Sequence, residues 1–415
     1  MLKKRIALGA ALVVVSLTLA GCSSKGTDAP AAADGSLLTD FGVTDDTITL
    51  GVLSDLSAVY GPLGQALVAG NQLYFDERNA NGGICGRQVE LDVRDHASDP
   101  QKAQALFQQL EPDVLGFTQV LGSPVIAALQ PSIHDANTLA FMAGWSSDFL
   151  GDDNIIVTGT TYAVDTINGI SYLMDEGKLQ AGDTIGHVYF DGDFGGDALK
   201  GSTYAADELG LNLRPIVITP KDTDLAAQVS QLQAAGVKAI VVSAGPKQLA
   251  SIAGQTGALG MDIPILTNTP AYNPALLESP AGPSLEKNLY LVTSLLPYAG
   301  EGDVPQKVAE LFNASGNSIV PNIQVNYGYS ISSIFGKALD VACENGDLSR
   351  EGVGTAMRSL KAIDTGLTPA QDLSNPKAAT TTESFILRAV NGLPGGNALE
   401  TKMGSSKTAE SYIKG

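Results

Sequence analysis

The sequence predicts an α/β fold built from mostly parallel sheets with helices on both faces. From Thr47 onward, short runs rich in β-branched residues alternate with longer amphipathic stretches, and turns rich in Gly, Pro, Ser or Asp separate them. This alternation is typical of parallel sheets, because each parallel strand needs a crossover connection that is usually a helix. Glycine accounts for 46 of the 415 residues, as expected for a chain with many tight turns.

The expected elements alternate along the chain. The strands are short apolar runs bounded by turn residues, at 47–53, 89–94, 114–117, 138–142, 184–189, 213–218, 239–243, 265–267 and 289–294. The helices are the amphipathic stretches between or after them, at 65–79, 101–109, 125–135, 165–176, 196–209, 225–235, 247–259 and 326–344. Ligands of such folds bind beyond the carboxyl ends of the strands, so we expect functional residues in the turns that follow them.

The first 21 residues have the pattern of a secretory signal peptide. Three basic residues precede an apolar run from Ile6 to Leu19, which ends in Leu19-Ala20-Gly21-Cys22. An uncleaved membrane helix is the alternative, but a span needs about 20 apolar residues and this run is shorter. The ending resembles the bacterial lipobox, which implies that Cys22 is acylated and becomes the first mature residue. Residues 22–45 then form a lipid-anchored tether, since Ser23 to Ser36 are small, polar and aperiodic.

Charge and composition exclude several classes of partner. The formal charge is −19, and it becomes −22 when the three basic residues of the signal are lost. Nucleic acid is therefore not expected as a partner, because phosphate binding needs clustered Lys and Arg. Only three His and three Cys are present, and His96, His134 and His187 are isolated in the sequence, so we expect no metal.

Two cysteines remain after the anchor, Cys85 and Cys343. In an exported protein we expect them to form a disulfide, since disulfides persist outside the cytoplasm. Two separate buried thiols are the alternative.

Catalytic and nucleotide-binding motifs are not found. The sequence contains no Gly-x-Ser-x-Gly nucleophile elbow, no phosphate loop ending in Gly-Lys-Ser/Thr and no Gly-x-Gly-x-x-Gly after the first strand. We therefore expect no enzyme activity and no cofactor.

Several motifs resemble type I periplasmic binding proteins of the branched-chain amino acid class, in the family's order. The runs Ile48–Gly61 and Gly70–Leu91 resemble the family's opening, and Asp99-Pro100-Gln101-Lys102-Ala103 is similar to its Asp-Pro-x-x-Ala. Gly122-Ser123-Pro124 and Thr365-Gly366-Leu367-Thr368-Pro369 follow in sequence. The resemblance covers about residues 47–391 and points to substrate-binding lipoproteins of ABC transporters, similar to leucine-binding proteins.

This resemblance implies two doubly wound parallel-sheet lobes joined by a three-crossover hinge, with the ligand enclosed between them. Residues 46–157 and 297–362 would form lobe 1, and residues 158–296 and 363–415 would form lobe 2. Cys85 and Cys343 then both fall in lobe 1, which supports their pairing.

The resemblance also implies a set of ligand-binding positions: Tyr60, Gly122, Ser123, Gly144, Trp145, Ser146, Phe194 and Thr269. Gly122 and Ser123 lie where the family binds a carboxylate. We expect Ser123 to be a helix N-cap and Pro124 the first helical residue, so that free amides face an anion. Simple packing is the alternative for Tyr60, and capping alone is the alternative for Ser123.

The ligand class depends on one departure from the family pattern. Amino acid binders hold the α-ammonium with a carboxylate where this sequence has Thr269. An enclosed ammonium without a counter-charge is costly, so either Asp191 or Asp193 replaces that carboxylate or the ligand has no ammonium. An amino acid, an amide, a small carboxylate and an aromatic acid all remain as candidates.

We therefore expect a monomeric, extracytoplasmic solute-binding lipoprotein of an ABC importer, anchored to the cell membrane and delivering a small polar organic ligand to permease subunits. A ligand-sensing receptor of the same fold is the alternative, and an extracellular hydrolase is a further one.

Overall fold

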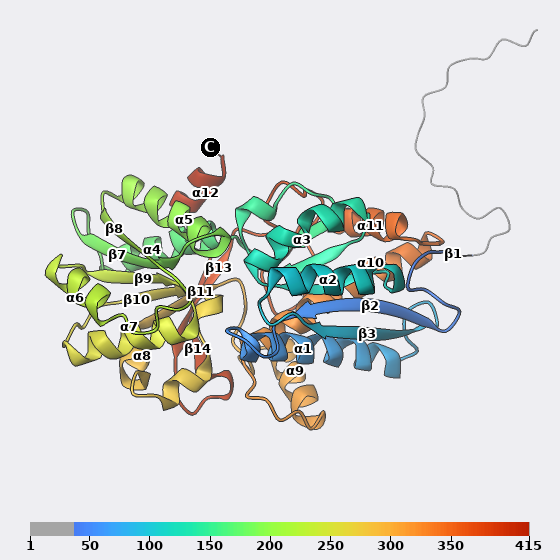
Figure 1. The fold of residues 1–415 in the computed structure, drawn as a ribbon, viewed down its shortest axis with the longest axis horizontal. Helices are drawn as coiled ribbons and strands as arrows, with labels where there is room; N and C mark the ends of the chain where they lie inside the picture. The colour runs from blue at the N-terminus through green and yellow to red at the C-terminus, as the bar shows by residue number, and fades with distance from the viewer. Residues whose placement is uncertain (1–36, 415) are drawn as a thin grey trace, which may run out of the picture.

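The computed structural model of the protein describes residues 37–414, so the expected signal peptide and the acylation site Cys22 lie outside the described residues. Two lobes lie side by side along the long axis of the molecule (Figure 1). Each lobe contains one large, mainly parallel sheet flanked by helices. The predicted two-lobed α/β fold is confirmed.

Lobe 1 contains a parallel five-stranded sheet in the order β3-β2-β4-β5-β6. Its central strand β4 is buried at every position, as expected for a strand covered on both faces. The strands are β2 (Thr47–Ser54), β3 (Gln88–Asp95), β4 (Gly116–Leu121), β5 (Ala140–Ala143) and β6 (Ile155–Val157). The helices are α1 (Gly61–Ala80), α2 (Pro100–Leu110), α3 (Ser123–Asp135), α9 (Asp303–Ala314), α10 (Ile323–Glu344) and α11 (Arg350–Ser359). A small pair, β1 (Leu38–Thr39) and β12 (Asp347–Leu348), adds a parallel ladder at the outer end.

Helices α1 and α10 approach each other closely because each has a glycine packed against the backbone of the other helix. A Cβ at Gly70 of α1 would collide with the Val325 carbonyl of α10, and a Cβ at Gly328 of α10 would collide with the Leu67 carbonyl of α1. The expected disulfide between Cys85 and Cys343 is present and joins the loop after α1 to the last turn of α10, with Cα atoms 6.2 Å apart. Lobe 1 is therefore covalently fastened on the side away from the other lobe.

Lobe 2 contains a seven-stranded sheet in the order β14-β13-β11-β10-β9-β7-β8. Strands β8, β7, β9, β10 and β11 are parallel, whereas β13 pairs antiparallel with both β11 and β14. The strands are β7 (Thr184–Phe190), β8 (Asn212–Ile218), β9 (Ala239–Ser243), β10 (Ile265–Asn268), β11 (Leu289–Thr293), β13 (Ser384–Ala389) and β14 (Asn397–Met403). The helices are α4 (Tyr162–Asp175), α5 (Asp193–Leu209), α6 (Ala226–Ala234), α7 (Pro246–Ala258), α8 (Gly282–Asn288) and α12 (Lys407–Lys414).

All of the expected strands and helices are present, with shifts of a few residues at their ends. Strand β6 has three residues and the hairpin β13–β14 is antiparallel, so neither fitted the long alternating pattern that predicted the rest. Helix α4 begins at Tyr162, three residues before the expected start, because Thr161 caps it by accepting a hydrogen bond from the Val164 amide. Leu38 and Thr39 were assigned to the tether, but they form β1.

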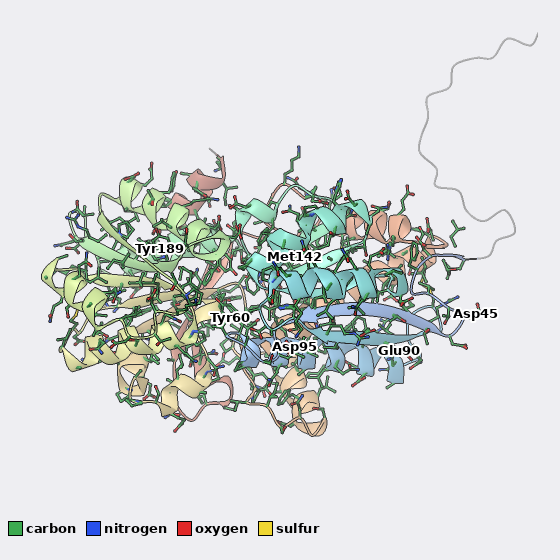
Figure 2. All side chains as sticks on the ribbon, viewed as in Figure 1. Asp45, Tyr60, Glu90, Asp95, Met142 and Tyr189 are labelled. Carbon is green, nitrogen blue, oxygen red and sulfur yellow. A yellow bond between two sulfur atoms is a disulfide. The ribbon has the colours of Figure 1, made fainter. Side chains whose placement is uncertain are left out.

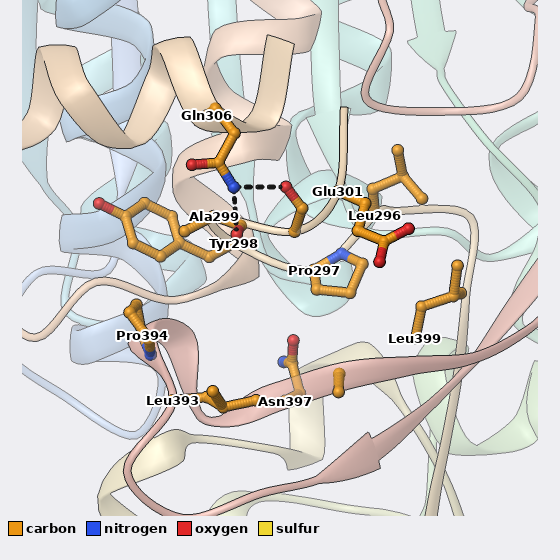
Figure 3. Close-up of a pocket in the computed structure, with 12 residues that line it drawn as sticks. Leu296, Pro297, Tyr298, Ala299, Glu301, Gln306, Leu393, Pro394, Asn397 and Leu399 are labelled. Carbon is orange, nitrogen blue, oxygen red and sulfur yellow. Dashed lines mark hydrogen bonds between the residues drawn. The ribbon is translucent and has the colours of Figure 1, made fainter. Parts of the chain in front are cut away.

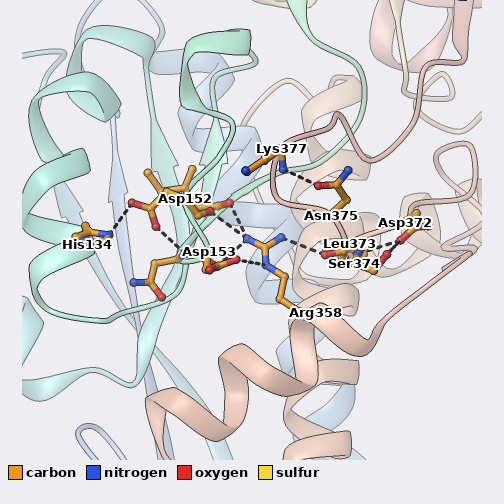
Figure 4. A network of polar contacts seen from close by, with 11 residues as sticks. His134, Asp152, Asp153, Arg358, Asp372, Leu373, Ser374, Asn375 and Lys377 are labelled. Carbon is orange, nitrogen blue, oxygen red and sulfur yellow. Dashed lines mark hydrogen bonds and ion pairs between the residues drawn. The ribbon is translucent and has the colours of Figure 1, made fainter. Parts of the chain in front are cut away.

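The chain passes between the lobes three times, at 158–161, 294–302 and 360–383. Gly159 sits in the first crossover with φ of +96°, and its amide donates to Gln371 Oε1 (2.9 Å) and Thr380 Oγ1 (2.8 Å) of the third. Arg358 of α11 extends this connection, because its guanidinium donates to the carbonyls of Asp153 (2.7 Å) and Leu373 (3.1 Å), as Figure 4 shows. The first and third crossovers are thus bonded to each other. Within residues 37–414, no helix is both long and apolar enough to cross a membrane.

Candidate functional site: a two-chambered cleft between the lobes

The turns that follow the carboxyl ends of strands in both sheets meet between the lobes. In the side-chain view, Tyr60 lies at this junction (Figure 2). Two hollows occupy the cleft, and Trp145 of lobe 1 and Tyr162 of lobe 2 line both of them. We call them the first and the second chamber.

The first chamber has mainly apolar and aromatic walls and a cavity volume of about 30 Å³. This is far below the range of about 300–1,000 Å³ for small-molecule sites, so the chamber is nearly closed in this structure and the lobes must separate to admit a ligand. It is lined by Tyr60, Leu63, Leu121, Gly122, Ser123, Pro124, Ala143, Trp145, Tyr162, Phe194 and Pro270.

The second chamber is smaller, at about 10 Å³, and more polar. One carboxylate and three hydroxyl side chains contribute to its lining, which consists of Trp145, Tyr162, Asp165, Thr269, Thr293, Ser294 and Leu295.

Tyr60 is presented to the first chamber by a turn that Asp55 organises. The Asp55 carboxylate follows β2, is fully buried, and accepts hydrogen bonds from the amides of Ala58 (2.6 Å) and Tyr60 (2.9 Å) and from Ser98 Oγ (2.5 Å). Burial, aided by the negative charge of Asp55, raises the pKa of the Tyr60 phenol, so Tyr60 stays neutral.

Helix α3 points its amino end at the same chamber. The structure makes Gly122 the N-cap, with φ of +99°, and Ser123 the first helical residue, so the expectation that Ser123 is the cap is wrong. Glycine is favoured at this φ, and its carbonyl accepts from the amides of Val125 and Ile126. Ser123 is only 4% exposed, and its hydroxyl makes no hydrogen bond of good geometry among the described residues, although the Tyr162 phenol lies near it. A buried hydroxyl and a helix amino terminus together favour an anionic ligand group.

Aromatic side chains connect the lobes across the cleft. The ring centroids of Trp145 and Tyr162 are 5.9 Å apart in an edge-on arrangement, and those of Tyr162 and Phe194 are 4.5 Å apart. Trp145 is held in place because its Nε1 donates to the Thr158 carbonyl (2.9 Å) and its ring packs on Tyr327. Burial raises the pKa of Tyr162, while its neighbour Ser123 acts in the opposite direction.

Polar contacts bridge the lobes beside the aromatic group. Ser147, in the short helix η2 (Ser147–Phe149) of lobe 1, donates to the buried carboxylate of Asp197 in α5 of lobe 2. Lys200 of α5 forms an ion pair with Asp148 of η2 at 2.8 Å. Burial raises the pKa of Asp197, although Ser147 and the Ala163 amide oppose the shift. The two lobes are therefore in direct contact at the cleft mouth.

The structure brings most of the expected ligand-binding residues together. Five of them, Tyr60, Gly122, Ser123, Trp145 and Phe194, line the first chamber. Thr269 lines the second, beside Trp145.

Gly144 and Ser146 line neither chamber. A Cβ at Gly144 would lie 2.6 Å from Ile126 Cδ1, so this glycine permits packing against α3. The Ser146 hydroxyl caps η2 by accepting from the Asp148 amide (3.3 Å). Asp191 and Asp193, expected as replacements for a missing carboxylate, also lie outside both linings.

Sequence analysis missed Tyr162 and Asp165. Both lie in the first turn of α4, and the expected helix began too late to place that turn at the cleft. The signal was available: Thr161 is a good N-cap residue two positions after a crossover glycine, and an aromatic residue follows it.

Other hollows and clusters lie away from the cleft. Two larger hollows, of about 340 and 470 Å³, lie at the edges of lobe 2. Figure 3 shows the first of these, between the 296–301 crossover and the β13–β14 hairpin, where Gln306 Nε2 supports the crossover by donating to the carbonyls of Ala299 (2.8 Å) and Gly300 (2.9 Å). Among residues 37–414, no group of three or more His, Cys, Asp or Glu is placed to hold a metal ion.

Residues 47–394 match the family model described as periplasmic binding protein. The chain belongs to this family. This periplasmic binding protein is 39% identical to the fatty acid ABC transporter substrate-binding protein from Thermomonospora curvata, with a TM-score of 0.89 and coverage of 92% of this chain and 98% of that one. Among the curated proteins, no sequence matches it.

More distant structures share the fold alone. A branched-chain amino acid ABC transporter protein from Thermus thermophilus with bound valine is 18% identical, with a TM-score of 0.80 and coverage of 90% of this chain and 100% of that one. A leucine-binding protein from Thermotoga maritima is 17% identical, with a TM-score of 0.73 and coverage of 86% and 99%. The predicted family membership of this periplasmic binding protein is confirmed.

Proposed function

We propose that this protein is the lipid-anchored, extracytoplasmic solute-binding component of an ABC importer, and that its ligand is a small monocarboxylate with an apolar body. It captures this ligand between its lobes as a monomer and delivers it to permease subunits. It performs no covalent chemistry on the ligand.

The chemistry of the first chamber carries this proposal. Its walls are apolar or aromatic, and its main polar feature is the amino end of α3 with the buried Ser123 hydroxyl. An apolar chain gains about 25 cal/mol per Å² when such walls remove it from water. A carboxylate gains charge-assisted hydrogen bonds at the helix terminus.

The similarity to the Thermomonospora curvata protein supports the same ligand class, because that protein is named a fatty acid ABC transporter substrate-binding protein.

A thermal-shift screen with straight-chain carboxylates of four to eight carbons tests the ligand class. Matched primary amides, alcohols and branched-chain amino acids serve as controls. We expect the carboxylates to raise the melting temperature by mass action and the alcohols to have little effect. Stabilisation by leucine or valine alone would overturn the proposed ligand class.

Trp145 provides a second reading of the same titration, because it is the single tryptophan of the sequence and lies in the cleft. We expect its emission to change as a carboxylate binds. Tight binding with constant emission would contradict the placement of the ligand beside Trp145.

The membrane anchor is tested by expressing the full chain and its Cys22→Ser variant in a bacterium. We expect the unaltered protein in the membrane fraction, with a mass showing acylation at Cys22, and the variant outside that fraction. Equal fractionation of the two proteins would exclude the lipid anchor.

A further inference from the structure

The second chamber differs in chemistry from the first, although both belong to one cleft. Trp145 and Tyr162 line both chambers and so form the partition between them. Beyond the partition, the lining side chains include the carboxylate of Asp165 and the hydroxyls of Thr269, Thr293 and Ser294, and no Lys, Arg or His. A plain apolar acid, bound in the first chamber, gives these groups no polar partner.

Asp165 has one carboxylate oxygen available to the second chamber. Its side chain comes from the first turn of α4 and is 6% exposed. Thr160 Oγ1 (2.5 Å) and Ser384 Oγ (2.8 Å) both donate to Oδ1, and no described residue donates to Oδ2. These two bonds orient the carboxylate, and they leave Oδ2 as an acceptor.

The Thr293 hydroxyl is not available as an acceptor, because it already accepts two hydrogen bonds. Thr293 Oγ1 accepts from Thr269 Oγ1 (2.9 Å) and from the Leu295 amide (3.3 Å). The strongest unfilled acceptor in the chamber is therefore Asp165. Because a buried carboxylate without a counter-charge is costly, a ligand group that donates a hydrogen bond to it is favoured.

We infer that the second chamber recognises a hydrogen-bond donor, a hydroxyl or an ammonium, at the end of the ligand remote from its carboxylate, and that Asp165 is the residue that selects it. This inference rests on the proposed function, since it assumes that the carboxylate occupies the first chamber. It makes the preferred ligand an ω-substituted acid with two polar ends and an apolar middle, which spans the partition formed by Trp145 and Tyr162.

Isothermal titration of three matched ligand series tests this inference on the full chain. The series are plain alkanoates, ω-hydroxyalkanoates and ω-aminoalkanoates of four to eight carbons. At the chain length that fits, we expect a donor-bearing ligand to bind about tenfold or more tightly than the plain acid, as is typical of a hydrogen bond to a charged group.

The Asp165→Asn variant identifies the residue responsible. We expect the ratio of affinities for the donor-bearing and plain ligands to fall by about tenfold, because the variant has no carboxylate to accept the donor. Using a ratio cancels any general effect on lobe closure. Asp191→Asn, an exposed aspartate outside both chambers, is the matched control and should leave the ratio unchanged.

Each outcome decides a different point. If plain alkanoates bind and no donor-bearing ligand binds more tightly at any length, this inference is overturned while the proposed function stands. If none of the three series binds, the proposed function itself fails. If the wild-type preference is present but survives in Asp165→Asn, the chamber does not select through Asp165.

Discussion

Replacing Asp165 by Asn should change the pH dependence of folding stability. Burial raises the pKa of the Asp165 carboxyl to about 6 from 3.8, even though Thr160 and Ser384 donate hydrogen bonds to it. The folded protein therefore holds this proton between about pH 4 and pH 6, whereas the unfolded chain has released it. Stability is then present at low pH and is lost as the pH rises through the folded pKa.

The magnitude follows from the shift. A difference of about two pKa units, at 1.36 kcal/mol per unit, corresponds to about 3 kcal/mol. We therefore expect the free energy of unfolding of the wild type to fall by about 3 kcal/mol relative to Asp165→Asn between pH 4 and pH 7. Asn keeps an oxygen that accepts from the same two hydroxyls, so the comparison isolates the titration.

Urea unfolding of the ligand-free protein at unit pH intervals from 4 to 7 measures this difference. Asp191→Asn serves as the control and should follow the wild type, because Asp191 is exposed. Parallel stability curves for the wild type and Asp165→Asn would refute the reasoning and would mean that Asp165 is better solvated than its 6% exposure indicates.

Three further predictions concern the hinge, the lobe contact and the disulfide. Gly159→Ala should cost about 1–3 kcal/mol of stability in urea unfolding and weaken ligand binding, because φ is +96° and the new Cβ would collide with the Ser294 hydroxyl. The control Gly151→Ala should cost less, because Gly151 has a similar φ of +108° but open space around the new Cβ. Lys200→Met removes the interlobe ion pair with Asp148, so it should lower stability by less than about 1 kcal/mol but increase the radius of gyration in solution scattering. The control Lys287→Met breaks an ion pair within lobe 2 and should leave the radius of gyration unchanged. Cys85→Ser should reduce the free energy of unfolding by about 2–5 kcal/mol while titration calorimetry shows intact carboxylate binding, because the disulfide lies away from the cleft.

Local sequence patterns determined most of the secondary structure. The runs that became β2, β7, β9 and β11 are apolar, short and bounded by turn residues, so their period and propensity sufficed to predict them. Strands β6 and β13–β14 were missed because a three-residue strand and an antiparallel hairpin at the sheet edge depend on their partners for stability. Such elements have little signal of their own.

The sequence also determined which turns face the cleft, because the carboxyl ends of parallel strands share one edge of a sheet. The family resemblance assigned Tyr60, Ser123, Trp145 and Phe194 to such turns, and they lie together. Ser146 was assigned to the ligand by the same reasoning, yet its hydroxyl is used to cap η2. The position of a residue in a turn does not reveal whether its side chain already forms a hydrogen bond with a nearby backbone group.

Only the tertiary structure decided which carboxylate reaches the cleft. Asp191 and Asp193 were plausible from their place after β7, but Asp165 of α4 is the one that lines the second chamber. Its position depends on the crossover at Gly159, on the angle at which α4 leaves it and on Ser384, 219 residues later in the chain. This contact lies within lobe 2 and forms because the third crossover returns the chain to that lobe, where β13 packs beside α4. Local periodicity contains no information about such tertiary assembly, and so the sequence predicted a cleft while the fold determined its two chambers.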